Sequence, residues 1–390
     1  MDVRLLTQKI RREALRLGFS EMGVARAGDA PGAGRFRAWL RDGFHGGMRY
    51  LERQEGRRAN PGLVLAGVRS ILVAAMSYHS DGAPAAAQQP EGEGVRGVIG
   101  RYARGADYHA IVKGRLEGLL AFVRGEVPSA RGVCHADTGP VAEKAWGAAT
   151  SVGWTGKHTG LVSRRLGTRF FLGVILLDIP LDYDDKGKEF CGTCRRCLDA
   201  CPTGALVQAY RLDARRCLSY LTIESRGEIP RGLRPLVGAR IFGCDACQDA
   251  CPWNRFAAAT PVGALAPRAE NLAPDLVPLA RLSREGFARR FAGSPVLRAT
   301  RDGFVRNVVV ALGNVGASDE GARDEVVQAL EAALGDYSPL VRAHAAWALG
   351  RVLRGRACAI LTSVRDRESD EGVLAEVARA LDGREEAGTG

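Results

Sequence analysis

The chain has 390 residues, which is enough for two or three domains with a substantial buried core. Apolar residues make up 46% and charged residues 25%, and the mean hydropathy is −0.10, which excludes a wholly disordered or fibrous protein. The net charge is +11, and 49 of the 55 basic residues are arginine. A polyanionic partner fits this charge, while codon bias accounts equally well for the preference for arginine over lysine.

Neither the apolar runs nor the N-terminus predict a membrane or secreted protein. The longest apolar run covers 170–177, far short of the roughly 20 residues that a membrane helix needs. The N-terminal segment carries charges at every helical turn, where a secretory peptide has an unbroken apolar core. We therefore expect a soluble cytoplasmic protein that does not bind membranes.

The first 185 residues predict a domain in which helices alternate with strands. We expect helices over 4–18, over about 107–126 and from Pro140 onward, and strands over 23–27, 70–78, 98–103 and 169–178. A segment rich in Pro, Gly, Gln and Glu at 80–96 predicts an exposed loop. This alternation is typical of an α/β domain.

The composition changes twice further along the chain. A polar linker at 182–190 leads into a cysteine-rich segment, and from about 265 the sequence becomes helical and has few cysteines. We therefore expect three domains, over 1–185, 186–264 and 265–390.

The last domain contains an internal repeat. Segment 303–316 resembles 339–352, and 372–381 is a weaker third copy, at a spacing of about 32 to 37 residues. This spacing is near that of two-helix solenoid repeats, so we expect a short HEAT-like array. A plain helical bundle is the alternative.

Eight of the ten cysteines fall between positions 191 and 251. The first run has the spacing C-x2-C-x2-C-x3-C-P, which is the bacterial ferredoxin pattern, and a second run lacks its first cysteine. With Cys217 added, eight thiolates suffice for two 4Fe-4S clusters. The crossing rule of such runs assigns one set to the first cluster, Cys191, Cys194, Cys197 and Cys251, and another to the second, Cys201, Cys217, Cys244 and Cys247. Zinc is the weaker alternative. We expect Cys134 and Cys358 to be buried small apolar residues.

The segment 135–146, HADTGPVAEKAW, is a candidate active site. Pro140 suits the first position of a helix, which places Asp137, Thr138 or Gly139 at the helix N-terminus. Asp137 is then either a simple N-cap or an acid that donates a proton from a desolvated pocket, and spacing alone favours the N-cap.

Several motifs together resemble the epoxyqueuosine reductase family, the last enzymes of queuosine biosynthesis. The motifs are RYARGADYH at 101–109, HADTGPVAEKAW at 135–146, GWTGKHT at 153–159, the doubled cysteine runs with CPTGAL and CPWN, and CLSYLTIESRGEIP at 217–230. The cysteine runs occur in many ferredoxin-like proteins, whereas the second and third motifs are specific. The resemblance covers about residues 1–260, and the helical tail agrees with it.

The resemblance implies an α/β N-terminal cobalamin-binding domain, a ferredoxin-like two-cluster insert and all-α HEAT-like C-terminal repeats. It also implies that the clusters feed single electrons to cobalamin, whose low-valent cobalt removes the epoxide oxygen of epoxyqueuosine in the tRNA anticodon loop. In the family, the aspartate of the H-A-D-T-G motif is the proton donor. That position is Asp137 in this chain, so the resemblance reverses the choice made from spacing.

The resemblance further implies a set of cobalamin contacts. They are Arg58, Tyr102, Asp137, Trp154, Lys157, His158, Ser219, Asp245 and Ala246. Without the family, Arg58 and Lys157 could be surface charges, Trp154 a core aromatic and His158 a satisfied polar residue. No histidine is proposed as the axial ligand of cobalt, because a corrin can be bound without a protein ligand and the sequence does not decide the axial ligation.

A basic face suits tRNA, and Arg226 is the expected contact beside the pocket. Arg306, Arg342 and Arg351 are either a second contact surface on the helical repeats or solvated arginines. An electron donor of unidentified kind is required, and we expect a monomer.

Two other functions compete with this interpretation. A corrinoid reductive dehalogenase also joins cobalamin to two clusters, but it has no use for the basic surface and the helical tail. A non-catalytic two-cluster electron carrier does not need some 190 residues ahead of its cysteines.

Overall fold

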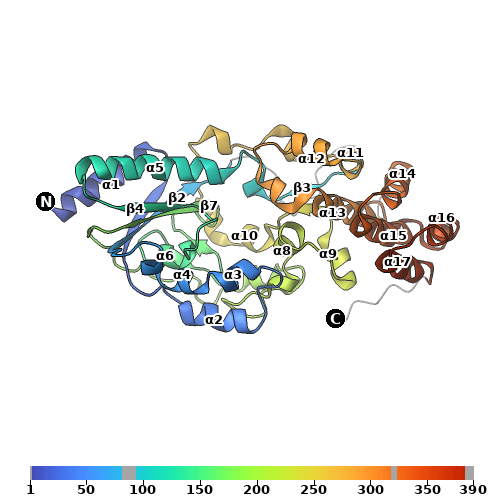
Figure 1. The fold of residues 1–390 in the computed structure, drawn as a ribbon, viewed down its shortest axis with the longest axis horizontal. Helices are drawn as coiled ribbons and strands as arrows, with labels where there is room; N and C mark the ends of the chain where they lie inside the picture. The colour runs from blue at the N-terminus through green and yellow to red at the C-terminus, as the bar shows by residue number, and fades with distance from the viewer. Residues whose placement is uncertain (1, 81–93, 318–322, 383–390) are drawn as a thin grey trace. The chain divides into compact units, whose positions relative to one another are not determined.

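A computed structural model of the chain describes residues 2–80, 94–317 and 323–382 (Figure 1). Its contacts divide it into two compact units, each built from three stretches of sequence. The first unit comprises Met1–Gly82, Ala106–Arg215 and Ala246–Ala266, and the second comprises Ala83–Gly105, Arg216–Asp245 and Pro267–Gly390. The three-domain division over 1–185, 186–264 and 265–390 stays a prediction. Most of the loop expected at 80–96 lies outside the described residues.

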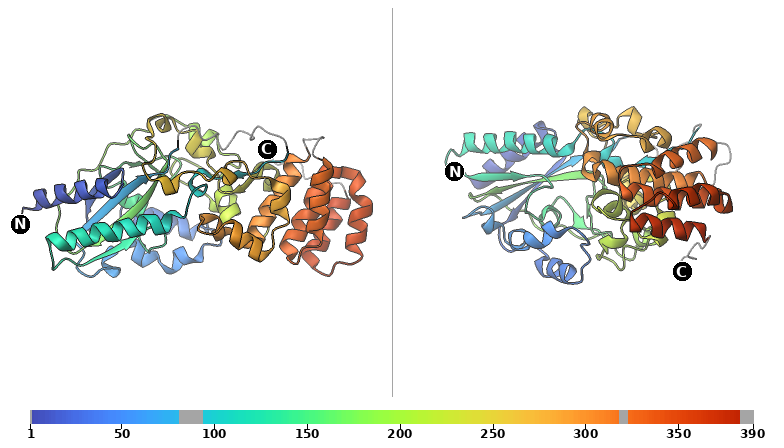
Figure 2. Two further views of the ribbon diagram at one scale, coloured as in Figure 1. Left: turned by 90° about the horizontal axis from the view of Figure 1, so that it is seen from above. Right: turned by 45° about the vertical axis from the view of Figure 1, so that its right-hand side comes forward.

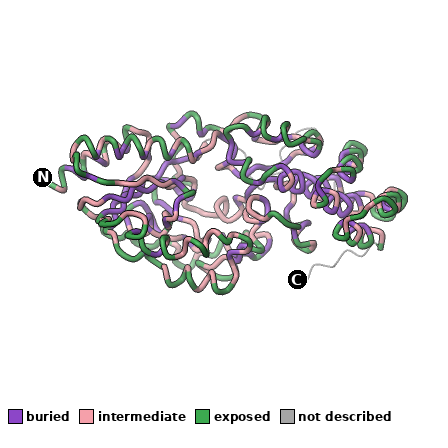
Figure 3. Tube along the Cα trace, viewed as in Figure 1, coloured by how far each residue is buried: buried purple, intermediate pink, exposed green. Residues whose placement is uncertain are grey.

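A four-stranded antiparallel sheet forms the centre of the first unit (Figures 1 and 2). In spatial order its strands are β1 (Glu21–Arg26), β2 (Ser70–Ser77), β7 (Phe170–Leu177) and β4 (Gly132–His135). Every residue of β2 is buried, because β2 is a central strand flanked by β1 and β7 in a sheet whose faces are covered by helices (Figure 3). The strands expected at 23–27, 70–78 and 169–178 are confirmed. The short, half-buried β4 has no alternation that would predict it.

Two long helices, α1 (Val3–Arg16) and α5 (Tyr108–Glu126), lie side by side on one face of this sheet (Figures 1 and 2). Asp2 caps the N-terminus of α1, and Asp107 caps that of α5 by accepting from the backbone N of His109. Helix α5 packs so closely on β7 that a Cβ at Gly173 would lie 2.7 Å from Cδ1 of Leu116. Both helices agree with the expected ranges.

The other face of the sheet is covered by the short helix α6 (Glu143–Gly147). Its Trp146 packs with Val73 of β2 and with Val174 and Leu176 of β7. The sequence between β4 and α6 therefore runs from the sheet edge to this face, and it carries the H-A-D-T-G motif.

Further short elements complete the first unit. They are α2 (Ala33–Arg41), α3 (Arg49–Arg53), α4 (Glu55–Ala59), β5 (Trp154–Thr155), β6 (Leu161–Val162), α7 (Arg196–Asp199) and α10 (Ala246–Asp249). None was predicted, because one or two turns of helix show little periodicity.

The second unit contains the helical repeats. Its last five helices are α13 (Thr300–Val315), α14 (Arg323–Leu334), α15 (Pro339–Leu353), α16 (Cys358–Arg365) and α17 (Glu371–Leu381). Helices α13, α15 and α17 contain the three similar segments, and α15 packs against both of the others. The repeat expected from the sequence therefore corresponds to the stack of α13, α15 and α17, which we call the inner helices.

Two glycines at matching places in the repeat allow these helices to approach closely. A Cβ on Gly313 would lie 2.7 Å from Cβ of Ala348, and one on Gly350 would lie 3.0 Å from Cβ of Ala380. A side chain at Gly313 therefore requires a shift of α15, and one at Gly350 leaves almost no room against α17.

The rest of the second unit is assembled from short elements. They are β3 (Val98–Ile99), α8 (Leu218–Ile223), α9 (Arg234–Val237), β8 (Arg240–Phe242), α11 (Leu276–Ala280) and α12 (Arg284–Arg290). The strand expected at 98–103 is wrong beyond Ile99. The backbone N of Gly100 bonds to the carbonyl of Phe242, and a single 3-10 turn follows at Arg101–Ala103.

Two further expectations concern membranes and isolated cysteines. Over the described ranges, no helix is both long and apolar enough to cross a membrane. Cys134 is half-buried, but Cys358 is exposed at the start of α16, so the expectation of a buried Cys358 is wrong.

Candidate functional site

The H-A-D-T-G motif forms a loop between β4 and α6, with Asp137 near its start. Asp137 has a left-handed backbone, with φ of 60°, and α6 begins only at Glu143 after Ala142. The start expected for this helix at Pro140 is therefore wrong by three residues, and Asp137 is not an N-cap. The reason is that Arg58 Nη2 and Nη1 donate to the carbonyls of Gly139 and Val141, at 3.1 and 3.0 Å, which removes these groups from a helix.

Gly139 is required for the path of this loop. A Cβ at this position would lie 2.3 Å from Nδ1 of His135, the last residue of β4. The loop therefore folds back tightly over the strand end and presents Asp137 outward, with 63% of its side chain exposed.

Two side chains from the start of α5 hold the Asp137 carboxylate. Tyr108 Oη donates to Oδ2 of Asp137 at 2.9 Å, and Nε2 of His109 lies 3.2 Å from the same oxygen. The other ring nitrogen of His109, Nδ1, lies 2.6 Å from Oδ1 of Asp107. The site thus contains a row of two carboxyl groups with an imidazole between them.

The electrostatics of this row favour charged groups. Burial raises the pKa of Asp137, but the hydrogen bonds from His109 and Tyr108 outweigh it, so this pKa lies below its ordinary value. Burial lowers the pKa of His109, but its bonds to Asp137 and Asp107 outweigh this effect, and the pKa is raised.

Glu143, the first residue of α6, has the opposite tendency. Burial raises the pKa of its carboxyl group to about 7, and the Asp137 charge raises it as well. Two carboxyl groups of one loop and helix therefore differ in protonation near neutral pH, as in many acid–base sites.

Several buried polar atoms around this loop have no hydrogen-bond partner among the described residues. They are Arg58 Nε, His135 Nε2, Glu143 Oε1, Trp146 Nε1 and His158 Nε2. Buried polar atoms are ordinarily paired, so this set fits a ligand that carries many polar groups at its rim. Burial also lowers the pKa of His158 to about 4, which leaves a neutral ring.

The four cysteines expected to hold the first cluster lie together in the first unit. Burial raises the pKa of the Cys251 thiol to about 11, and the neighbouring thiols of Cys191, Cys197 and Cys194 raise it further. Four neighbouring thiols are the donor set of a 4Fe-4S cubane. Among the described residues, no three His, Cys, Asp or Glu side chains converge on a position for a single metal ion.

Residues of the G-W-T-G-K-H-T motif hold the first cysteine loop. Trp154 Nε1 donates to Sγ of Cys191 at 3.4 Å, and Lys157 Nζ donates to the carbonyls of Gly192 and Cys194 at 2.6 and 2.9 Å. Trp154 is therefore a buried aromatic that also donates a hydrogen bond to the Cys191 thiol, and Lys157 is not a free surface charge.

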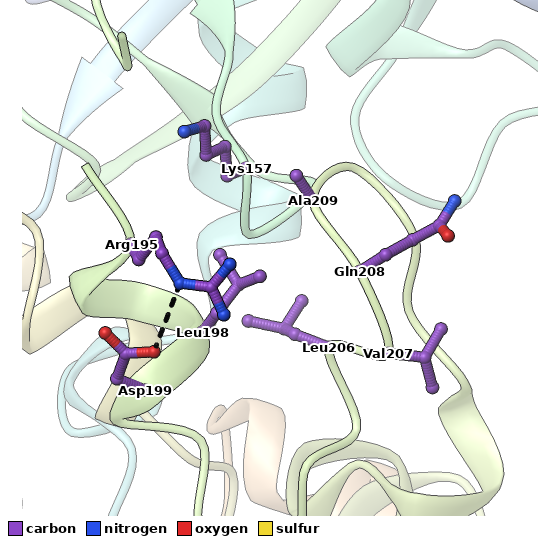
Figure 4. A pocket seen from close by; sticks show the side chains of 8 residues that line it. All are labelled: Lys157, Arg195, Leu198, Asp199, Leu206, Val207, Gln208 and Ala209. Atoms are coloured by element: carbon purple, nitrogen blue, oxygen red, sulfur yellow. Dashed lines mark ion pairs between the residues drawn. The ribbon is translucent and has the colours of Figure 1, made fainter. Parts of the chain in front are cut away.

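A pocket of about 300 Å³ lies beside this loop (Figure 4). It is lined by Lys157, Arg195, Leu198, Asp199, Leu206, Val207, Gln208 and Ala209. Arg195, the N-cap of α7, and Asp199, its last residue, form an ion pair of 3.7 Å at the edge of the pocket.

Comparison with protein families matches three parts of the chain. The model described as "Epoxyqueuosine reductase QueG, DUF1730" matches residues 58–138, which include Arg58 and Asp137. A 4Fe-4S double cluster binding domain matches 190–254, and HEAT repeats match 296–382.

Curated relatives match over most of the chain. The epoxyqueuosine reductase of Escherichia coli (strain K12) is 37% identical over 93% of this chain and 93% of its own length. That of Pseudomonas aeruginosa is 39% identical over 90% of this chain and 95% of its own length. The chain belongs to the epoxyqueuosine reductase family. Its cysteines form a 4Fe-4S double cluster domain, so zinc is the wrong alternative.

Solved structures of this family share the fold. A crystal structure of epoxyqueuosine reductase with an epoxyqueuosine-modified tRNA-Tyr stem loop has a TM-score of 0.88 and 27% identity, and covers 97% of this chain and 98% of that one. A Bacillus subtilis epoxyqueuosine reductase, whose catalytic aspartate loop is swung out of its active site, has a TM-score of 0.88 and 26% identity, and covers 98% and 99%. The family favours the reductase over the dehalogenase and the electron carrier.

The remaining expected site residues divide between the units. Tyr102, Ser219 and Asp245 belong to the second unit and Ala246 to the first. The buried Asp245 accepts from the backbone N of Arg101 at 2.8 Å. Cys201 and Cys247 belong to the first unit and Cys217 and Cys244 to the second, so the ligand set of the second cluster stays a prediction from spacing.

The arginines expected at a tRNA surface have different environments within the second unit. Arg226 is exposed, and its Nη1 and Nη2 donate to the carbonyls of Ala299 and Arg298 at 2.8 and 2.7 Å. Arg306 is fully buried, so its placement on a surface is wrong. Its guanidinium points inward to backbone carbonyls, including that of Leu221 at 2.6 Å.

The other two repeat arginines are only partly available to a partner. Arg342 forms a paired ion bridge with Glu368, with N–O distances of 2.7 and 2.9 Å. Arg351 is half-buried, and its guanidinium lies 5.8 Å from the centre of the Trp347 ring.

Sequence reasoning did not single out His109, Asp107, Tyr108 or Glu143. The first three follow one another at the start of α5, and an N-capping Asp followed by a His two residues later was the available signal. Glu143 gave no signal, because its environment depends on the position of α6 against the sheet.

Proposed function

We propose that the chain reduces epoxyqueuosine to queuosine in the anticodon loop of tRNA, with two 4Fe-4S clusters and cobalamin as cofactors. The observation that carries this proposal is the match to curated epoxyqueuosine reductases over 93% and 90% of the chain. The exposed Asp137 carboxylate and the grouped thiols supply the chemical groups that the reaction needs.

The reaction is a two-electron reduction. Two C–O bonds of the epoxide break, a C=C bond forms, and the oxygen takes up two protons to leave as water. When bound, the clusters transfer single electrons and cobalamin supplies a low-valent, nucleophilic cobalt centre. The residues of the chain hold these groups, orient the epoxide and deliver protons.

Asp137 is the proposed proton donor to the departing oxygen. Its side chain is 63% exposed at the front of a tightly turned loop, so a substrate can approach it. General acids must lie within hydrogen-bond reach of the atom that they protonate, and an exposed loop carboxyl meets this condition.

The proposed cobalamin contacts are supported by the unpartnered atoms of the first unit. Arg58 and His158 each have a buried nitrogen without a partner among the described residues, and cobalamin carries amide groups that can bond to them. Trp154 and Lys157 contact the first cysteine loop, which suits residues between a corrin and a cluster. Tyr102, Asp137, Ser219, Asp245 and Ala246 complete the proposed contacts.

The ligands of the clusters follow the crossing rule of ferredoxin runs. We assign Cys191, Cys194, Cys197 and Cys251 to the first cluster. We assign Cys201, Cys217, Cys244 and Cys247 to the second.

The tRNA is the proposed polyanionic partner, since the net charge is +11 and a family member binds a modified stem loop. Arg226 is the proposed contact. It is exposed, and a guanidinium has five N–H donors, so its bonds to the three carbonyls of Ile223, Ala299 and Arg298 leave donors for a phosphate. We expect a cytoplasmic monomer that receives electrons from a separate donor.

The test is a single-turnover assay without oxygen. Protein reconstituted with iron, sulfide and cobalamin is mixed with a strong reductant and tRNA that carries epoxyqueuosine, and the nucleosides are analysed by mass spectrometry. Loss of one oxygen from the modified base supports the proposal. An absence of conversion, with clusters and corrin confirmed by spectroscopy, would overturn it.

A further inference from the structure

We propose that His109, held between Asp107 and Asp137, stores a proton and passes it through Asp137 to the oxygen that leaves the epoxide. This inference rests on the proposed function. It makes His109 a positioning and relay residue, while Asp137 remains the group that touches the substrate.

The hydrogen-bond pattern around His109 requires an additional proton. Nδ1 faces Oδ1 of Asp107 at 2.6 Å, and Nε2 faces Oδ2 of Asp137 at 3.2 Å. A neutral imidazole carries one N–H and can donate to only one carboxylate. Both contacts are satisfied only if the ring is an imidazolium or if one carboxyl group is protonated. In either case the row holds one transferable proton.

The fold holds the imidazole in this position from two sides. Asp107 is the N-cap of α5, so its Oδ1 also accepts the backbone N–H of His109 at 3.0 Å. The ring of Tyr108 stacks on His109 with a centroid distance of 4.1 Å, and on Phe171 of β7 with the same distance. The imidazole is therefore positioned by the helix start and by the sheet.

The groups around this row favour the proton on His109 over the proton on Asp137. Tyr108 donates to Asp137, the Asp107 charge raises the pKa of His109, and the Lys144 charge lowers the pKa of Asp137. The Asp137 charge in turn raises the pKa of Glu143. The hydrogen bonds that lower the pKa of Asp137 make it a poor acid by itself at neutral pH, whereas the pKa of His109 is raised. Asp137 consequently needs a neighbour that supplies the proton.

The proton balance is complete with water as the source. The imidazolium gives its proton to Asp137, and Asp137 protonates the oxygen as the first C–O bond breaks. His109 is then neutral and is reprotonated from solvent, which reaches it because 31% of its side chain is exposed. A second transfer by the same route converts the hydroxyl group to water as the second C–O bond breaks and the C=C bond forms. The two electrons come from the clusters of the proposed function.

The first measurement titrates His109 in the holoenzyme by NMR of ¹³C-labelled histidine. The His109 signal is identified by its loss in His109→Gln. We expect an apparent pKa above about 6.5, the ordinary value for histidine. Asp107→Asn and Asp137→Asn should each lower it by about 1 unit or more, since each removes an adjacent negative charge. If His109 titrates in both variants at the same pH as in the wild type, the proposal is overturned.

The second measurement is the pH dependence of the single-turnover rate. We expect His109→Gln to lose about 10²-fold in rate and to lose the fall in rate at high pH that deprotonation of His109 causes. Asp107→Asn should move that fall to lower pH. Glu117→Gln removes an exposed carboxylate from the same helix and should leave the profile unchanged.

The outcomes separate this inference from the proposed function. If the wild type does not convert epoxyqueuosine, the proposed function fails, whereas the NMR titration still tests the row of three groups. If conversion occurs and His109→Gln has the rate and pH profile of the wild type, the relay is wrong and the proposed function stands.

Discussion

Two histidines, one in each unit, show how differently the two units use their polar groups. His344 in α15 is fully buried, with Nδ1 2.7 Å from the carbonyl of Leu340, and its Nε2 accepts the backbone N–H of Ile229. One donor and one acceptor suit a neutral ring, and burial lowers its pKa well below the ordinary value. His109 faces two carboxylates, which suit a charged ring. The partners, rather than the residue type, decide whether a histidine stabilises a fold or stores a proton.

The same contrast holds for the surroundings of these residues. In the helical repeats, Arg306 donates to backbone carbonyls and Asn307 bonds to those of Thr222 and Ile241 at 2.8 and 2.9 Å. Around the Asp137 loop, five buried polar atoms lack partners among the described residues. The first arrangement stabilises the unit, and the second is suited to a ligand. We therefore expect substitutions in the two regions to affect different properties.

Asp137→Asn should have the largest effect. The rate of epoxide reduction should fall by about 10²–10⁴-fold, because a positioned acid is lost. The free energy of unfolding should change little, since the side chain is mostly exposed. Single-turnover kinetics and thermal unfolding of the same preparation check this. If Asp137→Asn greatly lowers the free energy of unfolding, the polar groups of this loop stabilise the fold, as those of the repeats do, and the contrast between the two regions is wrong.

Arg306→Met should have the opposite profile. It removes the donor from several buried carbonyls, so the free energy of unfolding should fall by about 3–5 kcal/mol. Denaturant titration measures this change. Arg289→Ala, on the exposed side of α12, is the matched control and should have a small effect. A stable Arg306→Met with weakened tRNA binding would return Arg306 to a binding role.

Glu143→Gln should alter how stability depends on pH. The folded-state pKa of Glu143 is raised to about 7, so the stability that it contributes is complete below about 4.5 and is lost as pH rises through about 7. Glutamine has no such loss. The variant should therefore gain stability relative to the wild type between pH 5 and 8, by at most about 3 kcal/mol. If the melting temperatures of the two proteins change in the same way with pH between 5 and 8, the raised pKa is contradicted.

The smallest effects should be opposite slopes at the two histidines. The pKa of His344 is lowered, so its contribution is present above about 6.5 and is lost as pH falls below it. The pKa of His109 is raised, so its contribution is present below about 6.5 and is lost as pH rises through the raised value. Hydrogen exchange of peptides from α15 and α5 at pH 5.5 and 7.5, corrected for intrinsic rates, should show these slopes. Equal slopes would mean that both rings have the same charge state.

The sequence predicted those features that depend on local periodicity or on spacing. The strands around Val73 and Val174 have continuous apolar runs, and the repeat of α13 and α15 keeps a glycine at the matching position. The cysteine spacing predicted the cluster domain for the same reason, since the loop itself must wrap the cofactor.

The features that were missed depend on contacts between distant segments. The helix expected from Pro140 begins only at Glu143, because Arg58 holds the loop carbonyls, and no local pattern shows that contact. Arg306 has the sequence of an exposed repeat arginine, but carbonyls about 80 residues away in the chain surround it. His109 and Asp137 are separated by 28 residues, so only the fold brings the row together.

Gly313 and Gly350 set the distance between neighbouring inner helices of the repeats. Gly313 packs against Ala348, and Gly350 packs against Ala380. The distance between each pair of neighbouring inner helices therefore depends on one glycine, which has no side chain. Lengthening this array by another helix pair would require a glycine at the matching position, near the C-terminal end of α17. With any larger residue, the added helices would pack at a greater distance from α17, and the curvature of the array would change there.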